Sequence, residues 1–270
     1  MQDPLATRVA SQAVPTLPAE TLHGGRTVVS LTFDDGWADQ YTNARSILAA
    51  RGMRATFYVN SNRISTLGFL TWAQLEALRT DGHEIGGHTL DHVDITKVSE
   101  EEARRQVGDD RAALLERGFD VQSFAYPFGE YNAIARSILH ECGYASGRRA
   151  WGLRDLDAVR HDSRLAAGSI RPADRYVIPT ACVRSSTPLA TLQDRIVRAE
   201  NGDGHSWLPL VLHRVSGDSG DSLASISPTT LDALLAWLQG REANGTVVRP
   251  ICEVVGDERR VTPSTTRTAA

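Results

Sequence analysis

Runs of β-branched and apolar residues alternate with amphipathic segments along most of the chain. The runs have the length of buried strands, and the amphipathic segments space their apolar residues as helices do. Strand-like runs cover residues 26–33, 54–60, 83–88, 121–127, 176–183, 208–213 and 246–255, and helical patterns cover residues 40–52, 71–82, 100–118, 133–143, 191–200 and 227–240. This alternation predicts an α/β fold built on a mostly parallel sheet.

Capping residues mark the starts of several predicted helices. Thr71 and Gln74 have the spacing of a capping box, in which each side chain bonds to the backbone N–H of the other residue. Ser227 followed by Pro228 marks another start, because proline suits the first position of a helix. These signals support the helical reading of the segments that follow them.

The β/α units continue without a separating linker over residues 26–256. Seven or eight such units predict a closed or nearly closed barrel in a single domain. Residues 1–25 are expected to form an N-terminal extension, and the Ser/Thr-rich residues 257–270 a tail or linker. Residues 145–175 show no clear period, and we expect them to leave the barrel as an excursion.

Composition and charge narrow the range of partners. The formal net charge of −4 comes from mixed charges without a basic stripe, which argues against nucleic acid as a partner. No apolar run reaches the roughly 20 residues that a membrane span needs, so we expect no membrane span. We also expect the protein to be a monomer. The three cysteines lack CxxC spacing, which leaves open both one disulfide with a spare thiol and three free thiols.

Residues with catalytic chemistry stand at the ends of predicted strands. Asp34 and Asp35 follow the first strand, His88 and His92 lie at and after the end of the third, and His213 ends the run 208–213. The sequence YPFG ends the fourth strand. In a β/α barrel the carboxyl ends of the strands meet at the face where active sites form. We therefore expect these residues to gather in one site.

Two histidines four residues apart and a carboxylate make a three-ligand set for zinc. Such a set leaves positions open for water and substrate, which is typical of a catalytic site. Asp35 is taken as the carboxylate ligand, and its neighbour Asp34 as the group that takes a proton from water. Gly36 permits the sharp turn that brings both carboxylates to one centre.

The motifs LTFDDG, HTLDH, YPFG and LVLH occur in this order between Val28 and Val255. They resemble the successive motifs of the NodB-homology polysaccharide deacetylases, the carbohydrate esterases of family four. The resemblance covers most of the chain, and its first two motifs are the most specific. It implies a distorted (β/α) barrel, commonly of seven strands, and a catalytic zinc ion that cobalt or another divalent ion can replace.

The resemblance also implies a role for each matching residue: Asp35, His88 and His92 as metal ligands, Asp34 as general base and His213 as general acid. Hydrolysis of an N-acetyl amide needs an activated water, a stabilised oxyanion and a proton for the departing amine. These residue types supply the base, the acid and the metal site that the reaction requires.

Further residues are expected to contact the substrate. Pro127 has no N–H to donate, so the backbone N–H of Phe128 is the expected oxyanion donor. Leu210 is expected to line a small apolar pocket for the acetyl methyl group. Trp37 and Tyr126 are expected to offer faces on which a sugar ring stacks.

The chain departs from the family pattern in two places. Many members carry an arginine two residues before the proline of the third motif, where it contacts the base aspartate, and this chain has Ala125 there. Either Asp34 lacks a stabilising cation or another arginine fills the space. The aspartate that orients the acid histidine is also hard to place, and we assign it to Asp174, with Asp157 as the second choice.

The sequence therefore predicts a metal-dependent hydrolase that removes N-acetyl groups from an N-acetylglucosamine polymer: chitin or its oligomers, peptidoglycan or poly-N-acetylglucosamine. The same site acting as an acetylxylan O-deacetylase is one alternative, and a glycan-binding homologue with little activity, suggested by Ala125, is another. The expected partner is an acetylated polysaccharide or oligosaccharide. The family and the Thr-rich tail predict a secreted protein.

Overall fold

A closed barrel of parallel strands forms the centre of the computed structural model, which describes residues 27–153, 167–169, 172–202, 205–217 and 225–259. The strands follow one another in the order β1, β2, β3, β4, β5, β7, β8. The ring closes because β8 pairs with β1 along the whole length of both strands. The strands are β1 (Thr27–Phe33), β2 (Thr56–Val59), β3 (Glu84–Gly87), β4 (Ser123–Ala125), β5 (Ser146–Gly152), β7 (Ile178–Cys182) and β8 (Ser206–Leu212). The predicted seven-stranded barrel is confirmed.

The barrel is distorted where its first strand changes neighbours. β11 (Thr246–Val248) pairs with the first half of β1, and β2 pairs with the end of β1. Three two-residue strands lie outside the ring: β6 (Gly168–Ser169) is antiparallel to β8, and β9 (Arg214–Val215) pairs with β10 (Ser225–Ile226). The strands of the barrel therefore differ in length and in the number of their neighbours.

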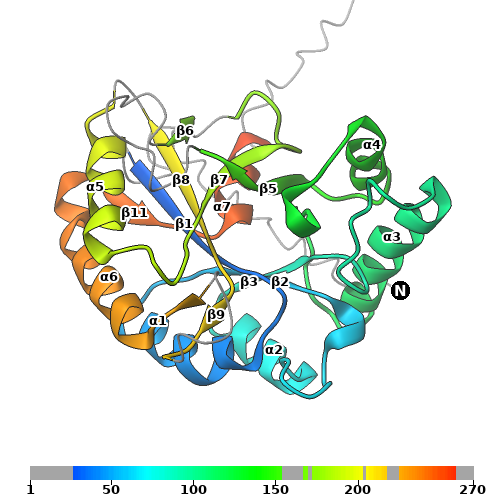
Figure 1. Ribbon diagram of the computed structural model, residues 1–270, viewed down its shortest axis with the longest axis horizontal. Helices are drawn as coiled ribbons and strands as arrows, with labels where there is room; N and C mark the ends of the chain where they lie inside the picture. Colours follow the sequence, from blue (N-terminus) through cyan, green and yellow to red (C-terminus); the bar gives the residue numbers. More distant parts are fainter. Residues whose placement is uncertain (1–26, 154–166, 170–171, 203–204, 218–224, 260–270) are drawn as a thin grey trace, which may run out of the picture.

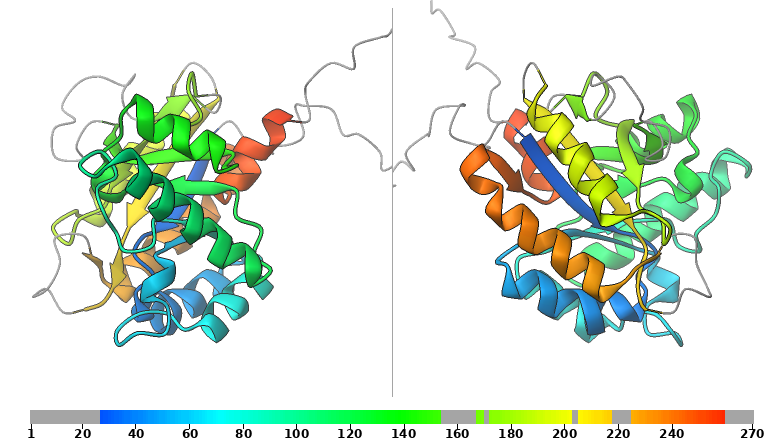
Figure 2. Two further views of the ribbon diagram at one scale, coloured as in Figure 1. Left: turned by 90° about the vertical axis from the view of Figure 1, so that its right-hand side faces the viewer. Right: turned by 60° about the vertical axis from the view of Figure 1, so that its left-hand side comes forward.

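Helices cover the outside of the barrel (Figures 1 and 2). They are α1 (Arg45–Ala50), α2 (Trp72–Thr80), α3 (Glu100–Glu116), α4 (Ala133–Glu141), α5 (Leu189–Glu200), α6 (Pro228–Gly240) and α7 (Ile251–Arg259). The predicted capping box is present, since Thr71 accepts from the Gln74 backbone N–H and the Gln74 side chain accepts from the Thr71 N–H. Ser227 likewise caps α6.

Two segments differ from the sequence prediction. β5 belongs to the barrel wall, although residues 145–175 were expected to leave it. Residues 246–255 are split between the short strand β11 and helix α7, which extends to Arg259 into the segment expected to be a tail. Both segments are short, so their tertiary partners rather than a local pattern set their structure.

Cysteine pairing was left open by the sequence, and no membrane span was expected. None of the cysteines, which lie at the end of α4, at the end of β7 and in α7, forms a disulfide bond. Within the described ranges, every helix is too short or too polar to cross a bilayer.

The amino-terminal end of the barrel is closed by α7. The Ile251 N–H donates to Thr56 Oγ1 at 3.0 Å, and the Cys252 N–H donates to a carboxylate oxygen of Glu84 at 2.9 Å. Glu84 is buried and also accepts from Thr56 and Ser123. Burial raises the pKa of Glu84, and these hydrogen bonds oppose that rise. With this end sealed, a substrate can reach the barrel only from the carboxyl ends of the strands.

His83, at the start of β3, gives a testable pH dependence of stability. Its Nδ1 accepts a hydrogen bond from the Ala55 N–H at 3.1 Å, so protonation of that nitrogen must break the bond. Burial lowers the pKa of His83 to about 4, whereas an unfolded histidine titrates near 6.5. The unfolded chain therefore binds more protons between these two values. The stabilisation is fully present above pH 6.5 and is lost as the pH falls toward 4.

We expect the wild-type protein to lose about 2–3 kcal/mol more unfolding free energy than a His83→Gln variant between pH 7 and pH 4.5. Urea denaturation of both proteins at the two pH values measures the difference. His92 and His213 titrate in the same direction, so only the difference between the two proteins reports on His83. Identical losses in both proteins would show that His83 is not the source.

Candidate metal centre and active site

The carboxyl ends of β1 and β3 bring Asp35, His88 and His92 together. Asp35 Oδ1 lies 3.5 Å from His88 Nε2 and 3.2 Å from His92 Nε2. One potential ligand atom from each residue lies within 4.8 Å of those of the other two. The spacing of the first two motifs thus brings to one point three side chains that could hold a metal ion.

Strained backbone turns present these side chains. Asp35, Thr89 and His92 have φ values of 71°, 67° and 63°, a region that residues other than glycine rarely adopt. Asn60 stabilises the turn that follows β3, because its Nδ2 donates to the carbonyls of both His88 and Thr89. Strain of this kind persists only where surrounding contacts fix it, and it is common at functional sites.

A buried carboxylate on α3 fixes the same turn from the other side. Asp110 accepts from the His88 N–H at 3.1 Å and from the Ser61 N–H at 2.9 Å. Burial raises the pKa of Asp110 to about 6, against the effect of these hydrogen bonds. Gly87 leaves room for this contact, since a Cβ there would lie 2.9 Å from the Asp110 carboxylate and 2.0 Å from Tyr144 Oη.

The hydrogen bonds around the three residues fit a cation. His88 Nδ1 lies 2.7 Å from the Ala125 carbonyl, which can only accept, so a neutral His88 directs the lone pair of Nε2 toward Asp35. Trp37 Nε1 donates to Asp35 Oδ2 at 3.0 Å, while the buried Oδ1 has no hydrogen-bond partner within the described residues. Lone pairs that converge without a proton between them repel each other unless a cation joins them.

The charge states agree with that reading. Burial lowers the pKa of His92 to about 4, so its imidazole is neutral near pH 7 and able to bind a metal. Burial opposes ionisation of Asp35, but the nearby imidazoles of His88, His213 and His92 outweigh it and hold its pKa below the ordinary value. One carboxylate and two imidazoles suit a borderline divalent ion such as zinc or cobalt.

Asp34 is not one of the three residues of this centre and pairs with a buried arginine. Arg148, in β5, is fully buried, and its guanidinium bonds to Asp34 Oδ1. Its Cζ also lies 4.6 Å from the centroid of the Tyr58 ring. Arg148 is the register partner of Ala125 in the β4–β5 pair, so the small side chain at position 125 lies beside the arginine. β5 thus supplies the cation that the third motif, at the end of β4, lacks.

The sequence analysis missed Arg148 because it treated residues 145–175 as an excursion. The signal was an arginine in the short run SGRRAWG, whose first three residues are buried in the structure. An arginine at an inward position of a strand needs an acidic partner.

His213 approaches Asp34 from the end of β8. Its Nε2 lies 4.0 Å from Asp34 Oδ2, the oxygen that Arg148 does not hold. Gln40 joins the two strand ends, since its Nε2 donates to the carbonyls of both Asp34 and His213. Burial lowers the pKa of His213 to about 4; Asp35 opposes this shift, and Arg148 adds to it.

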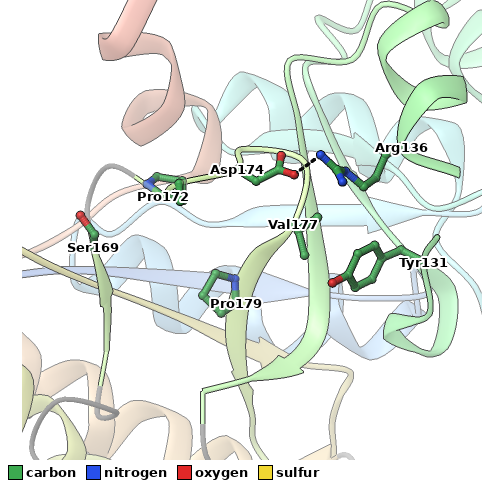
Figure 3. Close-up of a pocket in the computed structure, with 8 residues that line it drawn as sticks. Tyr131, Arg136, Ser169, Pro172, Asp174, Val177 and Pro179 are labelled. Atoms are coloured by element: carbon green, nitrogen blue, oxygen red, sulfur yellow. Dashed lines mark ion pairs between the residues drawn. The ribbon is translucent and has the colours of Figure 1, made fainter. Parts of the chain in front are cut away.

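The acid-orienting assignment to Asp174 is wrong. Asp174 pairs with Arg136 of α4 beside a cavity of about 420 Å³ (Figure 3), and its carboxylate accepts from the Tyr176 N–H. It precedes β7, so it lies toward the end of the strand remote from the site. Within the described residues His213 Nδ1 has no hydrogen-bond partner. Asp157, the second choice, lies outside the described residues.

The predicted sugar-stacking roles of Tyr126 and Trp37 are not supported. Tyr126 is 1% exposed, and its ring packs against Phe124 with centroids 5.5 Å apart. The Trp37 indole stacks on Phe69 at 4.6 Å and lies under the Arg214 guanidinium at 4.9 Å, while its N–H binds Asp35. Trp37 therefore holds the Asp35 carboxylate, a contact that sequence reasoning did not assign to it.

Leu210 also lies on the wrong face for the predicted acetyl pocket. Side chains alternate along β8, so Leu210 shares a face with Leu212 and Leu208, and all three belong to the core cluster that includes the helices. Val211 shares the face of His213 and pairs in register with Thr32, which precedes Asp34 by two residues. Pro127 and Phe128 lie in a turn at the site, where the Phe128 ring contacts His92 with centroids 4.7 Å apart.

Replacing Trp37 by phenylalanine tests the hydrogen bond to Asp35. Phenylalanine keeps a ring on Phe69 but removes the N–H, so Asp35 can rotate or bind in a bidentate mode. We expect the zinc affinity, measured by competition with a chromophoric chelator, to fall roughly tenfold. Trp72→Phe is the matched control, since Trp72 lies in α2 and its ring also packs under an arginine, Arg117. The zinc affinity of this variant should stay at the wild-type value. An unchanged Kd for Trp37→Phe would refute the orienting role.

Comparison with known proteins agrees with the geometry. Residues 22–147 match the family model described as polysaccharide deacetylase. A chitin deacetylase from Colletotrichum lindemuthianum is 30% identical over 151 residues, covering 52% of this chain and 56% of that protein. The peptidoglycan-N-acetylglucosamine deacetylase PgdA from Listeria monocytogenes is 28% identical over 117 residues, covering 43% and 24%. The matches span between 24% and 57% of the lengths of such curated relatives.

The solved structures show the same fold. A family 4 acetyl xylan esterase from Clostridium thermocellum, in complex with a cobalt ion, superimposes with a TM-score of 0.56 at 21% identity and covers 85% of this chain and 90% of that chain. The matched residues 22–147 include Asp34, Asp35, His88, His92 and the YPFG turn. Through this segment, just under half of its length, the chain is similar to the polysaccharide deacetylase family, as its motifs predicted.

Proposed function

We propose that this protein is a metal-dependent hydrolase that removes N-acetyl groups from an N-acetylglucosamine-containing polysaccharide. The observation that carries the proposal is the placement of Asp34. One of its oxygens is held by Arg148, and the other faces His213 Nε2 across 4.0 Å, directly beside the three-residue metal centre. The relatives named as chitin and peptidoglycan deacetylases support the choice of an N-acetylated glycan.

Asp35, His88 and His92 would hold the metal ion, and zinc is the ion that this ligand set suits best. A divalent ion at such a centre polarises a carbonyl and makes water a better nucleophile near neutral pH. Trp37 keeps Asp35 Oδ1 directed at the centre by occupying Oδ2. The Ala125 carbonyl does the same for His88, because it fixes the proton on Nδ1.

Asp34 is assigned as the general base. Its free oxygen, Oδ2, takes a proton from the attacking water, while Arg148 holds Oδ1 and stabilises the ionised carboxylate in a dry interior. His213 Nε2, 4.0 Å from Asp34 Oδ2, then passes that proton to the departing amine, which cannot leave as an anion. The backbone N–H of Phe128 is assigned to the oxyanion, and Val211 to the acetyl methyl group in place of Leu210.

O-deacetylation of acetylxylan by the same site is the second candidate, since an acetyl xylan esterase shares the fold. An inactive glycan-binding homologue was suggested by Ala125 alone, and the contact of Arg148 with Asp34 removes that reason. Because these polymers lie outside the cell membrane, we further propose that the protein acts as a secreted enzyme.

Acetate release from acetylated glycans is the direct test. We expect release from N-acetylglucosamine oligomers or polymers, loss of release after treatment with a chelator, and recovery on addition of Zn²⁺ or Co²⁺. His213→Ala should impair amide hydrolysis much more than ester hydrolysis, because an alkoxide leaves more readily than an amine anion. Acetate from acetylxylan alone would favour the second candidate, and no acetate from any substrate would refute both.

Exchange of the arginine between strands tests the role of Arg148. Arg148→Met leaves Asp34 as a buried charge without a partner, so kcat should fall roughly 100-fold or more, with reduced stability. Adding Ala125→Arg in the register-paired position should restore part of kcat. Arg149→Met is the control, since the Arg149 guanidinium lies over the Tyr131 ring. Loss of stability without loss of kcat in the folded Arg148→Met protein would contradict the proposed role.

A further inference from the structure

Two exposed aromatic rings lie next to each other at the rim of the site. Phe128 is 57% exposed and Trp151 is 39% exposed. Trp151 Nε1 donates to the Phe128 carbonyl at 3.2 Å, and the Phe128 ring meets the His92 ring edge-on. In the part of the chain that the structure describes, they are the aromatic members of a small set of exposed large apolar side chains. The apolar surface is thus continuous with the metal centre.

The local backbone is built to expose these rings. Phe128 has a φ of 59°, a strained value for an aromatic residue, and this turn directs its side chain outward. Gly129 follows with a φ of 74° and lets the turn pack against β5, because a Cβ there would lie 2.7 Å from the Ala150 nitrogen and 3.0 Å from Trp151 Cδ1. A fold that only needed to bury these rings would have no use for the strain.

The indole is also held in place before any ligand binds. Its N–H is engaged by Phe128, and the Arg184 guanidinium lies 5.5 Å from the Trp151 ring centroid. A ring fixed on two sides loses little conformational entropy when a ligand stacks on it. An exposed apolar patch with this preorganisation is typical of a binding surface.

We infer that Phe128 and Trp151 form the binding surface for a pyranose ring, the sugar unit next to the one that loses its acetyl group. This inference rests on the proposed function. A pyranose has an apolar C–H face that suits the electron-rich face of an aromatic ring, and hydroxyls at its edge remain in water. Because Phe128 adjoins His92, the acetyl group under attack occupies the metal centre, and the chain of sugars extends over the turn toward Trp151.

This arrangement makes chain length a specificity determinant. A single sugar or a small aryl ester reaches the metal centre without contacting Trp151, whereas an oligomer contacts both. The protein therefore favours oligomers over monomers, and the preference resides in KM rather than in kcat, since Trp151 touches a unit that does not react.

Kinetics of Trp151→Ala on substrates of different length test the inference. We expect KM for N-acetylglucosamine oligomers to rise roughly tenfold with kcat within about twofold of the wild type, and hydrolysis of 4-methylumbelliferyl acetate to be unchanged. Trp151→Phe, which keeps an aromatic face but loses the N–H, should show a smaller rise. Leu115→Ala is the control: Leu115, on α3, is 41% exposed, and its loss should alter neither substrate.

An unchanged oligomer KM in Trp151→Ala would overturn the inference, and so would an equal loss on the aryl acetate in a variant with normal circular dichroism. If the wild-type protein releases no acetate from any glycan, the proposed function fails. Whether Phe128 and Trp151 bind sugar is then tested separately, by measuring oligomer binding. Calorimetric titration of chelator-treated protein with the oligomers would then support the surface only if the wild type binds them and Trp151→Ala binds at least fivefold more weakly.

Discussion

The buried ion pair between Arg148 and Asp34 is the interaction on which the rest of the site depends. Both side chains are almost completely shielded from water, where an unpaired charge is costly. The pair joins β5 to β1 across the interior of the barrel, so it can form only when the ring of strands has closed. It also leaves one Asp34 oxygen without the arginine, and that oxygen faces His213. Closure of the barrel and formation of the ion pair that holds Asp34 are therefore one event.

The turns around the metal centre depend on buried polar side chains outside the motifs. Gln40 holds the carbonyls at the ends of β1 and β8, Asn60 holds two carbonyls after β3, and Asp110 holds the amides of His88 and Ser61. These contacts balance the positive φ angles at the ligands. Gln40, Asn60 and Asp110 come from different elements. The positions of the residues at the candidate metal centre therefore depend on how these elements pack on the barrel.

The two ends of the barrel have opposite roles. At the amino-terminal end, the N–H groups of α7 bind Thr56 and the buried Glu84, and apolar residues of α7 fill the opening. At the carboxyl end, the exposed Phe128 ring contacts His92 of the centre, and Trp151 donates to the Phe128 carbonyl. Sealing one end concentrates the exposed polar and aromatic groups at the other, where a polymer can lie across the surface.

The sequence by itself determined most of the order of strands and helices, the helix caps and the three residues that converge at the candidate metal centre, because these depend on local periodicity, capping chemistry and residues at strand ends. It also left two alternatives at Ala125, a missing cation or an arginine from elsewhere in the chain. The tertiary structure decided that Arg148 does so, that Trp37 binds Asp35, that Leu210 and Tyr126 face the core, and that Asp174 pairs with Arg136. Each of these outcomes depends on which strands become neighbours and which face each residue presents, and contacts between residues more than a hundred positions apart, such as Asp34 and Arg148, leave no periodic signal in the chain.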